Sequence, residues 1–530
     1  MHGQRWAKSY DEARKECIRD VARITNECER LNQGYRDPHF DIEWDLKSGQ
    51  RNCLDGLSRF SPDLKPKGVK RVTDIFEKPQ FYVNGPVAGD VRQGRDGDCY
   101  FMAALCGLGN MEGLIARVCV AQEEKVGVYG FVFYRDGERQ QTIIDDKLHL
   151  RAPDNDEASE ERDVWDDINR IDGEEEYRKA YQTGSRALYF AQCQDENETW
   201  LPSLEKAYAK AHGDYSSIDD GFTGEAIEDL TGGVTSKLYS TDILDKNEFW
   251  SNELMQFNKS FLFGCATGFY SNWLDTTGEK GPRERQGIAE GHAYSIMEAA
   301  EIKGEKLLKV RNPWGKKEWQ GKWSDGSEQW DVEWMTLLKH KFGDDGVSWI
   351  SYDDLLKKYQ HFDRTRIFDS AWNVSQCWTN VHVPWSAEYL STTFQLELKE
   401  NSKVVIVLSQ LDESYFGGLE GPYRFDLQFR LENASNDNNN DYIVRSNGNY
   451  AMARSASTDI ELETGIYTVL VKIAATRDNT EDSLEDLLPT YVATRREIDL
   501  NGHFLRPCTC QRCSYRDLGR EGRATCQGES

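Results

Sequence analysis

The chain has 530 residues, and this length predicts about three domains because a single hydrophobic core does not grow to that size. Aromatic residues make up 12% of the chain, which is typical of a well-packed globular protein and argues against a largely disordered one. The net charge of −26 argues against nucleic acid as a partner, because phosphate binding needs a basic surface, and it is compatible with local binding of hard cations.

An amphipathic helix is predicted over residues 5–32, where apolar residues recur at helical spacing among charged ones. We expect it to pack on a folded core as part of an N-terminal helical extension, residues 1–68. An inhibitory pro-segment is the less favoured alternative.

The first residues lack the apolar core of a signal peptide. No apolar run reaches the ~20 residues needed to span a bilayer, and residues 101–121, which come nearest, are interrupted by glycines and charges. The 13 cysteines are odd in number and scattered in spacing, which does not indicate a disulfide framework. We therefore expect a cytoplasmic protein in a reducing setting, without a transmembrane segment.

Residues 69–82 are rich in β-forming side chains and lead into the sequence QGRDGDCYFMAAL at residues 93–105. A glycine-punctuated polar loop there runs into an apolar, alanine-rich segment, and Cys99 stands where the two meet. Glycines let such a loop turn tightly, and the segment after it is rich in good helix formers. We therefore expect Cys99 at or near the first turn of a helix.

Residues 127–134 and 141–144 predict two paired strands joined by a turn at residues 135–138. Residues 152–176 are acidic and poor in large apolar groups, which favours a solvated surface insertion over a substrate-docking segment. Residues 234–240 follow a Gly-Gly pair, and we expect them to form a hinge between two lobes.

Strands of the second lobe are expected at residues 260–264, 292–298 and 306–311. Beyond them the chain changes to short β-rich runs separated by turn signals, which favours an antiparallel β-sandwich. These runs are residues 394–398, 404–408, 424–431 and 467–473. The last residues carry Cys508, Cys510, Cys513 and Cys526 near His503. A flexible tail is favoured there over a zinc site, because the spacing fits no common zinc knuckle.

Cys99 is the candidate nucleophile. The first turn of a helix offers unsatisfied N–H groups and a dipole that favour negative charge, which lowers a thiol's pKa and favours the thiolate. Gln93, shortly before it, could point its side-chain amide at a developing oxyanion. A cysteine is more often a small buried hydrophobe, so the assignment depends on its companions.

Those companions are His292 in the sequence GHAYS and Asn312 in the sequence RNPWG. Cysteine, histidine and asparagine, in this order and far apart in the chain, are typical of papain-like thiol proteases. The predicted chemistry is acyl transfer: His292 takes the proton of Cys99, the sulfur attacks a peptide carbonyl, and the imidazolium protonates the leaving amine. Asn312 would fix the tautomer and orientation of the imidazole, and Trp314 would shield that pair from water.

Together these motifs resemble the calpains, which are intracellular calcium-dependent cysteine endopeptidases. The resemblance rests on Gln-Gly-x-x-Gly-Asp-Cys, Gly-His-Ala-Tyr and Arg-Asn-Pro-Trp-Gly, and on the block between Leu204 and Gly233. It implies an α+β fold, a two-lobed papain-like cysteine protease core followed by an antiparallel C2-like β-sandwich. It also implies that Gln93 and the backbone N–H of Cys99 form the oxyanion hole. The implied divisions are residues 1–68 (N-terminal extension), 69–235 (lobe with Cys99), 236–365 (lobe with His292 and Asn312), 366–500 (sandwich) and 501–530 (tail).

The resemblance further implies calcium as a cofactor: each lobe binds one ion, and closure of the lobes aligns Cys99, His292 and Asn312. The first site would consist of the carbonyls of Val83 and Gly85 and the side chains of Asp90 and Glu205. The second site would consist of Glu318, Asp325, the carbonyl of Gly343, and Asp345. The chain departs from the family pattern at Val347, where a last acidic ligand is expected. We therefore expect the second site to bind calcium more weakly, or to use Asp344 as a substitute.

A penta-EF-hand domain is not expected, since the one segment that begins like an EF-hand loop, at residue 437, has Tyr442 where glycine is needed. Two rival functions stay open from the sequence. A catalytically silent calpain-like scaffold would bind partners or a membrane through its sandwich, although all catalytic positions are intact. Another thiol acyl chemistry, of a transglutaminase or a deubiquitinase, is also open; the former prefers aspartate as the third member. The expected partners are protein substrates and not nucleic acid.

Overall fold

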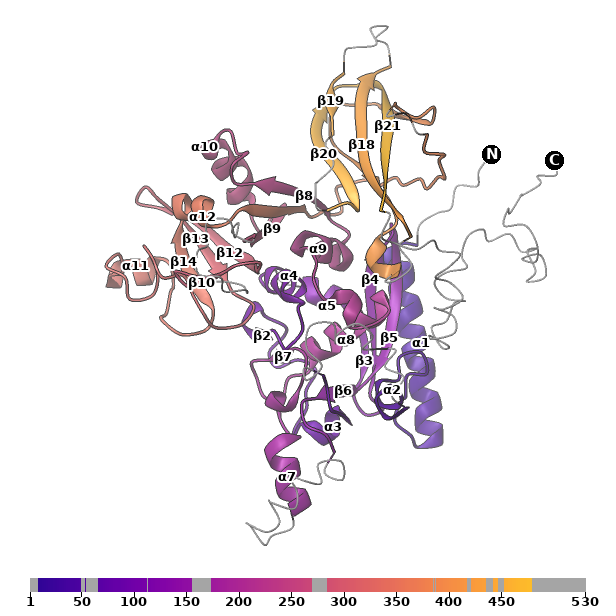
Figure 1. The fold of residues 1–530 in the computed structure, drawn as a ribbon, viewed down its shortest axis with the longest axis vertical. Helices are drawn as coiled ribbons and strands as arrows, with labels where there is room; N and C mark the ends of the chain where they lie inside the picture. The colour runs from indigo at the N-terminus through magenta and orange to yellow at the C-terminus, as the bar shows by residue number, and fades with distance from the viewer. Residues whose placement is uncertain are drawn as a thin grey trace, which may run out of the picture.

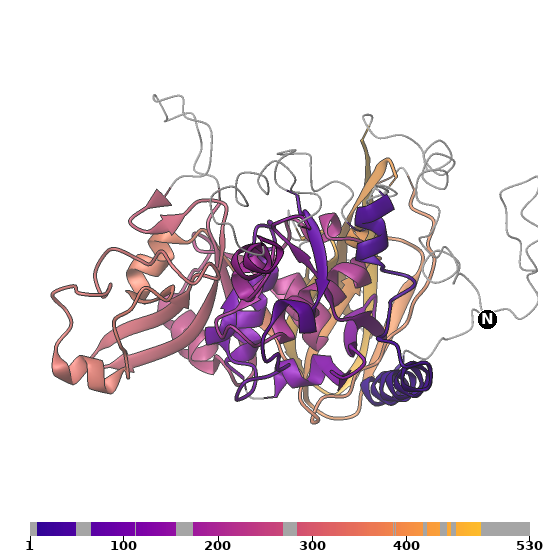
Figure 2. The same ribbon diagram turned by 90° about the horizontal axis from the view of Figure 1, so that it is seen from below.

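The computed structural model describes most of the chain, and Figures 1 and 2 show how its elements are arranged. The described residues are 8–48, 53, 65–111, 113–154, 173–268, 284–384, 386, 388–416, 421–434, 442–446 and 452–478. Below, the first lobe is the part up to Gly233, the second lobe runs from Val234 to Arg366, and the C-terminal unit follows.

The N-terminal helix α1 (Tyr10–Leu31) packs on a three-stranded antiparallel sheet of the first lobe, as its apolar pattern predicts. Ser9 begins the helix with a capping box, in which Ser9 and Glu12 each accept the other's backbone N–H. The sheet consists of β3 (Cys119–Glu123), β4 (Val128–Arg135) and β5 (Glu138–Asp145). The predicted hairpin between β4 and β5 is confirmed, and its turn residues Asp136 and Gly137 both have positive φ.

Helix α4 (Cys99–Gly109) runs through the centre of the molecule (Figure 1), and every residue from Tyr100 to Leu108 is buried. A helix that is apolar all round has to be enclosed on every side. It packs against α9 (Thr223–Thr231) of its own lobe and against β12 (Ala293–Ile302) of the second lobe. This packing holds Cys99, its first residue, where the two lobes meet.

The remaining elements of the first lobe surround α4. They are α2 (Ile42–Ser48), β1 (Gly68–Arg71), α3 (Val72–Ile75), η2 (Ala88–Asp90), β2 (Val91–Arg92), α5 (Leu114–Val118), β6 (Lys147–Leu150), α7 (Gly173–Tyr181), η4 (Ser185–Ala187), β7 (Gln192–Cys193), α8 (Trp200–His212) and η5 (Ser216–Ile218). The extended segment predicted over residues 69–82 is wrong beyond Arg71. The chain turns there into α3, because Val72 and Ile75 pack into a small cluster with Leu148.

The second lobe is built on a six-stranded antiparallel sheet with the order β14-β13-β12-β9-β15-β8. Besides β12 its strands are β8 (Val234–Tyr239), β9 (Phe261–Ala266), β13 (Glu305–Arg311), β14 (Val347–Ser351) and β15 (His361–Arg366). Around it lie α10 (Lys246–Glu248), η6 (Phe249–Glu253), η7 (Leu254–Gln256), β10 (Glu284–Arg285), β11 (Ile288–Ala289), α11 (Val332–Leu337) and α12 (Tyr352–Lys358). The three predicted strands are confirmed.

The predicted hinge over residues 234–240 is wrong. These residues form the edge strand β8, which pairs with β15 along its whole length. The chain passes between the lobes just before β8, at Gly232 and Gly233. Gly232 ends α9 with a positive φ.

Two antiparallel sheets make up the C-terminal unit, one with the order β16-β21-β18-β19 and one that pairs β17 with β20. Their elements are β16 (Thr393–Leu398), β17 (Ser402–Ser409), η9 (Glu413–Phe416), β18 (Tyr423–Asn433), β19 (Val444–Arg445), β20 (Ser455–Leu462) and β21 (Gly465–Arg477). The four predicted β-rich runs are therefore confirmed as strands. Phe429 and Leu431 of the first sheet share one hydrophobic cluster with Ala456 and Leu462 of the second, so the sheets pack face to face.

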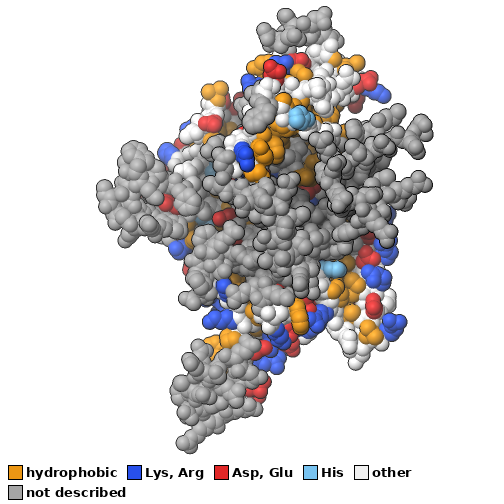
Figure 3. All heavy atoms as spheres, turned by 45° about the vertical axis from the view of Figure 1, so that its right-hand side comes forward, with side chains coloured by type: hydrophobic (Ala, Val, Ile, Leu, Met, Phe, Trp, Pro, Cys, Tyr) orange, Lys and Arg blue, Asp and Glu red, His pale blue; other side chains and the backbone are white. Residues whose placement is uncertain are grey.

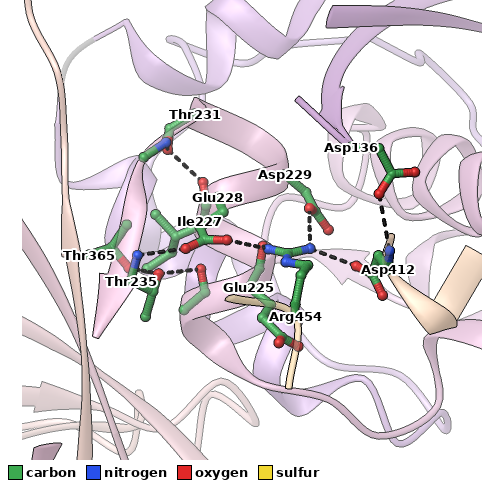
Figure 4. Close-up of polar contacts among 12 residues, drawn as sticks. Asp136, Glu225, Ile227, Glu228, Asp229, Thr231, Thr235, Thr365, Asp412 and Arg454 are labelled. Atoms are coloured by element: carbon green, nitrogen blue, oxygen red, sulfur yellow. Dashed lines mark hydrogen bonds and ion pairs between the residues drawn. The ribbon is translucent and has the colours of Figure 1, made fainter. Parts of the chain in front are cut away.

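The C-terminal unit is joined to the first lobe by a buried ion-pair network around Arg454 (Figure 4). The Arg454 guanidinium lies 2.7 Å from carboxylate oxygens of Glu228 and Asp229 in α9 and of Asp412, which precedes η9. Asp412 makes a second contact with the first lobe, because its backbone N–H donates to the carboxylate of Asp136 at 3.0 Å. The second lobe adds an ion pair between Arg366 and Asp459 of β20.

On the face drawn in Figure 3, acidic and basic side chains are interspersed over the described parts of the surface. No helix among the described residues is long and apolar enough to cross a membrane. The cysteine-containing tail, most of the acidic segment (residues 155–172) and residues 435–441 of the EF-hand-like segment lie outside the described residues.

Candidate active site

Cys99 begins α4 directly after a tight loop. The carbonyl of Asp98 accepts the N–H groups of Phe101 and Met102 at 3.0 and 3.1 Å, which closes the first turn of the helix. Two glycines make the loop possible, since a Cβ at Gly94 would overlap the backbone of Phe190 and a Cβ at Gly97 would overlap the Asp219 carboxylate. The predicted helix start at Cys99 is confirmed.

His292 and Asn312 come together because they stand at the same end of two paired strands. His292 immediately precedes β12 and Asn312 immediately follows β13, and these strands are antiparallel neighbours with Ser295 opposite Arg311. The imidazole Nε2 lies 2.9 Å from Oδ1 of Asn312, and both side chains are buried.

The orientation of the Asn312 amide determines which imidazole nitrogen carries the proton. Its Nδ2 donates to the carbonyl of Lys317 at 3.0 Å, and its Oδ1 accepts the backbone N–H of Trp314 at 3.0 Å. Because the oxygen therefore faces His292, Nε2 has to be the protonated nitrogen and Nδ1 is left as the acceptor. The Trp314 ring stacks on the imidazole with centroids 4.1 Å apart and covers the pair.

Contacts between the lobes join the loop before Cys99 to the strand ends that carry His292 and Asn312. The backbone N–H of Gln93 donates to the carbonyl of Pro313 at 3.0 Å, and Arg311 donates to the carbonyls of Gly89 and Val91 at 3.1 and 3.2 Å. The backbone N–H of Ala293, the residue after His292, acts on the Cys99 sulfur and lowers its pKa. The backbone of Ala293 thus lies beside Cys99, and the side chain of Asn312 lies beside His292; a catalytic triad of the three residues stays a prediction.

Burial controls the protonation of the candidate catalytic pair. It raises the pKa of the Cys99 thiol to about 11, against the opposing effect of the Ala293 N–H, while Asp98 and Asp220 raise it further. It lowers the pKa of His292 to about 4, although the hydrogen bond to Asn312 opposes this and Lys317 adds to it. With these pKa values the thiol and the imidazole are both neutral at pH 7.

Gln93 lies on the same loop, with its side-chain Nε2 donating to the carbonyl of Asp96 at 2.8 Å. The Gln93 side chain also acts on the Asp98 carboxyl and lowers its pKa. Its own Oε1 is buried and has no hydrogen-bond partner among the described residues.

A pair of carboxylates lies at the turn of residues 83–90, and its members are Asp90 and Glu198. Glu198 accepts the N–H of Val83 at 2.7 Å, and its other oxygen is buried without a hydrogen bond of normal geometry among the described residues, although the Trp200 side chain acts on the carboxyl and lowers its pKa. Burial and the neighbouring charges of Asp90 and Asp195 raise the pKa of Glu198 to about 7. Burial likewise raises the pKa of Asp90. A buried carboxylate oxygen without a donor, beside a second acid, fits a hard cation.

The structure corrects one predicted member of this site. Glu205 does not accompany Asp90; its carboxyl accepts the N–H of Ala191 at 2.9 Å and lies against Asp98 and Asp96 beneath the cysteine loop. Glu198, which the sequence reasoning missed, stands in its place. The signal was available in the acidic stretch DENE at residues 195–198, just before the block that contains Glu205.

The second predicted calcium loop also gathers its carboxylates. Burial, Asp325 and Asp345 raise the pKa of Glu318 to about 7. Backbone N–H groups of Asp345 and Gly346 donate to Glu318 at 3.0 and 2.9 Å, and that of Gly343 donates to Asp325 at 3.0 Å. These oxygens already have donors, unlike the orphan oxygen of Glu198. Among the described residues no group of three or more His, Cys, Asp or Glu side chains is arranged to hold a metal ion, so carbonyl oxygens would have to complete either site.

Comparison with known proteins decides the family. Residues 55–167 and 179–366 match the family described as "Calpain family cysteine protease". The chain belongs to the calpain family. The match spans both lobes and omits residues 168–178, which overlap the end of the segment predicted to be an insertion, residues 152–176.

Several calpains are similar to this chain over the same region. Calpain-8 of Rattus norvegicus is 31% identical over 357 residues, which is 65% of this chain and 44% of the relative. The calpain-2 catalytic subunit of Homo sapiens is 30% identical over 371 residues, 67% of this chain and 46% of the relative. Calpain clp-4 of Caenorhabditis elegans is 31% identical over 356 residues, 62% of this chain and 44% of the relative. The chain thus matches a little under half the length of these calpains.

Proposed function

We propose that this calpain-family chain is a cysteine endopeptidase that cleaves protein substrates at internal peptide bonds. The observation that carries the proposal is the 2.9 Å contact between His292 Nε2 and Asn312 Oδ1, with the amide orientation fixed from both sides. It leaves Nδ1 of His292 as an acceptor, which in this proposal serves as the base for the thiol of Cys99. Family membership and the intact catalytic positions support the same chemistry.

The proposed reaction begins as the thiol proton of Cys99 moves to Nδ1 of His292 and the sulfur bonds to the substrate's carbonyl carbon. The carbonyl oxygen becomes negative and accepts hydrogen bonds from the backbone N–H of Cys99 and the amide of Gln93, where one donor is worth roughly 3–4 kcal/mol in other enzymes. The C–N bond then breaks as the imidazolium gives its proton to the leaving amine. A water, deprotonated by His292, hydrolyses the thioester and restores the thiol.

We further infer calcium as a cofactor, held in the first lobe by Asp90, Glu198 and the carbonyls of Val83 and Gly85. The orphan oxygen of Glu198 supports this assignment. A second ion would be held by Glu318, Asp325, Asp345 and the carbonyl of Gly343, more weakly because backbone N–H groups compete for the carboxylates. When bound, calcium supplies positive charge to carboxylates that otherwise repel one another.

The C-terminal unit completes the proposal as a C2-like sandwich that offers a peripheral contact to a protein or a membrane surface. Its two face-to-face antiparallel sheets support this assignment. The proposed setting is the cytoplasm, where a reducing environment keeps Cys99 as a thiol.

The test is cleavage of a quenched fluorescent peptide library and of casein, with calcium or with a chelator. We expect cleavage in calcium that is lost in Cys99→Ala and retained in Cys377→Ala, because Cys377 is exposed and far along the chain from the site. No cleavage by the wild type under any condition would favour the scaffold function. Equal cleavage in chelator would overturn the calcium dependence and leave the protease standing.

A further inference from the structure

Glu205, once separated from the calcium site, is a buried acid without a role in the chemistry described above. It lies on α8 with no exposed surface and accepts the N–H of Ala191 with both oxygens, at 2.9 and 3.2 Å. Its other neighbour is the carboxyl of Asp98, which is also fully buried and directly precedes Cys99 in the chain. Two elements far apart in sequence are therefore joined at the residue that begins the catalytic helix.

The contact between these carboxyls requires a proton. Neither oxygen of Asp98 accepts a hydrogen bond of normal geometry from a donor among the described residues, although the Gln93 side chain and the Asp98 backbone N–H act on its carboxyl and lower its pKa. Two buried carboxylates would repel each other, so their contact is a hydrogen bond only when one of them stays protonated. Glu205 is that partner, since burial and Asp98 both raise its pKa, whereas Glu205 lowers the pKa of Asp98 against the larger effect of burial.

The surroundings offer no cation to replace that proton. The ionisable groups that interact most strongly with the pair from the loops and helices around it are Asp96, Asp219, Tyr215 and Cys99. All of them are acids, so each of them opposes a second negative charge on the pair. The charge of Asp98 also raises the pKa of Cys99, which makes the protonation of the pair relevant to the nucleophile.

We propose that Glu205 is a positioning residue for the nucleophile: its carboxyl O–H donates to Asp98 and thereby fixes the start of α4 that presents Cys99. The proton also limits the Asp98–Glu205 pair to one negative charge beside the thiol. The inference rests on the proposed function only in taking Cys99 as the nucleophile. It differs from the calcium assignment, because Glu205 here works without a metal.

The experiment measures alkylation of Cys99 by iodoacetamide, followed by peptide mass spectrometry from pH 6 to 9.5, in the full chain. This readout measures the reactivity of Cys99 and needs no peptide cleavage. The positioning proposal can therefore be tested even if the chain cleaves no substrate. Glu205→Gln supplies a neutral amide that can donate to Asp98 and accept from Ala191, whereas Glu205→Met has similar length and can do neither. Glu225→Gln is the matched control, because burial raises the pKa of Glu225 to about 8 but its carboxyl does not join the Asp98–Glu205 pair.

At pH 7 we expect Glu205→Gln to react within threefold of the wild type and Glu205→Met to react at least tenfold more slowly. The amide of Glu205→Gln should thus restore the reactivity that Glu205→Met loses, and Glu225→Gln should react like the wild type. Equal rates for the Gln and Met variants would overturn the proposal. Should Glu205→Met not fold, Glu205→Gln decides alone, and a rate at least tenfold below that of the wild type would overturn the proposal.

Discussion

At the scale of single residues, the clearest result is that the protonated nitrogen of His292 follows from its neighbour. The Asn312 amide is fixed by the Lys317 carbonyl on one side and the Trp314 N–H on the other, so it accepts from His292 rather than donating to it. The sequence predicted Asn312 as the orienting residue from motif order alone. It could not show the role of Lys317, whose carbonyl reaches the amide only because its backbone has a positive φ of 63°.

Removing this orienting group should slow the chemistry more than it weakens substrate binding. In Asn312→Ala the imidazole loses its acceptor and can turn or adopt the other tautomer, so we expect kcat to fall at least tenfold with KM changed less than threefold. Steady-state kinetics on the fluorescent peptide would measure both. A KM effect larger than the kcat effect would count against this role for Asn312.

The raised pKa of Cys99 makes a prediction about reactivity toward a small alkylating agent. With a pKa of about 11 the thiol is almost fully protonated at pH 7, and its thiolate fraction rises about tenfold per pH unit below that value. Iodoacetamide should therefore label Cys99 slowly at pH 7 without calcium, and progressively faster as the pH rises to 10. A rate that is flat across this range would contradict a thiol held neutral by burial.

At the scale of elements, the sequence was most successful where structure is local. Glycines, helix formers and alternating apolar residues predicted the start of α4, the β4–β5 hairpin and the strands of the C-terminal unit. It was wrong where tertiary packing overrode local preference: residues 72–75 form a helical turn and residues 234–239 form the edge of a sheet. The strand β8 forms because β15, far along the chain, pairs with it.

The cysteine loop depends on close backbone approach at Gly94. Any side chain there would overlap the backbone of Phe190, which cannot move without disturbing the hydrogen bond between Ala191 and Glu205. We expect Gly94→Ala to reduce kcat/KM at least tenfold. As a control, Gly326→Ala changes a turn with open space around it, where only the positive φ opposes a side chain. A fully active Gly94→Ala would show that the loop can relax.

The two candidate calcium loops should differ in affinity. Glu198→Gln removes the carboxylate whose oxygen has no protein donor, whereas Glu318→Gln removes one that already accepts two backbone N–H groups. Isothermal titration should therefore show a larger loss of calcium affinity in Glu198→Gln than in Glu318→Gln, with Glu205→Gln close to the wild type. The reverse order, or a large loss in Glu205→Gln, would restore the assignment made from resemblance.

At the scale of the whole molecule, Arg454 joins the C-terminal unit to the first lobe. One guanidinium there faces carboxylates of Glu228, Asp229 and Asp412, which would repel one another without it (Figure 4). Sequence patterns gave no sign of this contact, because residues 228 and 454 share no local motif. Since α9 also packs against α4, the network reaches from the C-terminal unit to the helix that begins with Cys99.

Replacing Arg454 should destabilise this junction strongly. In Arg454→Met the buried acids lose their only guanidinium among the described residues of the network, which costs about 3–5 kcal/mol where one partner of a buried ion pair is removed. Hydrogen exchange of α9 and β20 should accelerate and the thermal midpoint should fall. Arg424→Met is the control, because Arg424 is exposed on β18. Equal effects of the two substitutions would mean that the network contributes little.

The sequence by itself predicted the candidate nucleophile, its base and its orienting asparagine, because turn glycines, a helix start and strand ends are local signals that can be recognised without knowledge of the fold. It determined the family for the same reason. Only the tertiary structure decided which acids meet: Glu198 joins Asp90, while Glu205 joins Asp98. Both glutamates lie in one stretch of chain, Glu198 just before α8 and Glu205 within it. The direction of each carboxyl depends on tertiary packing, which cannot be deduced from the spacing of the residues.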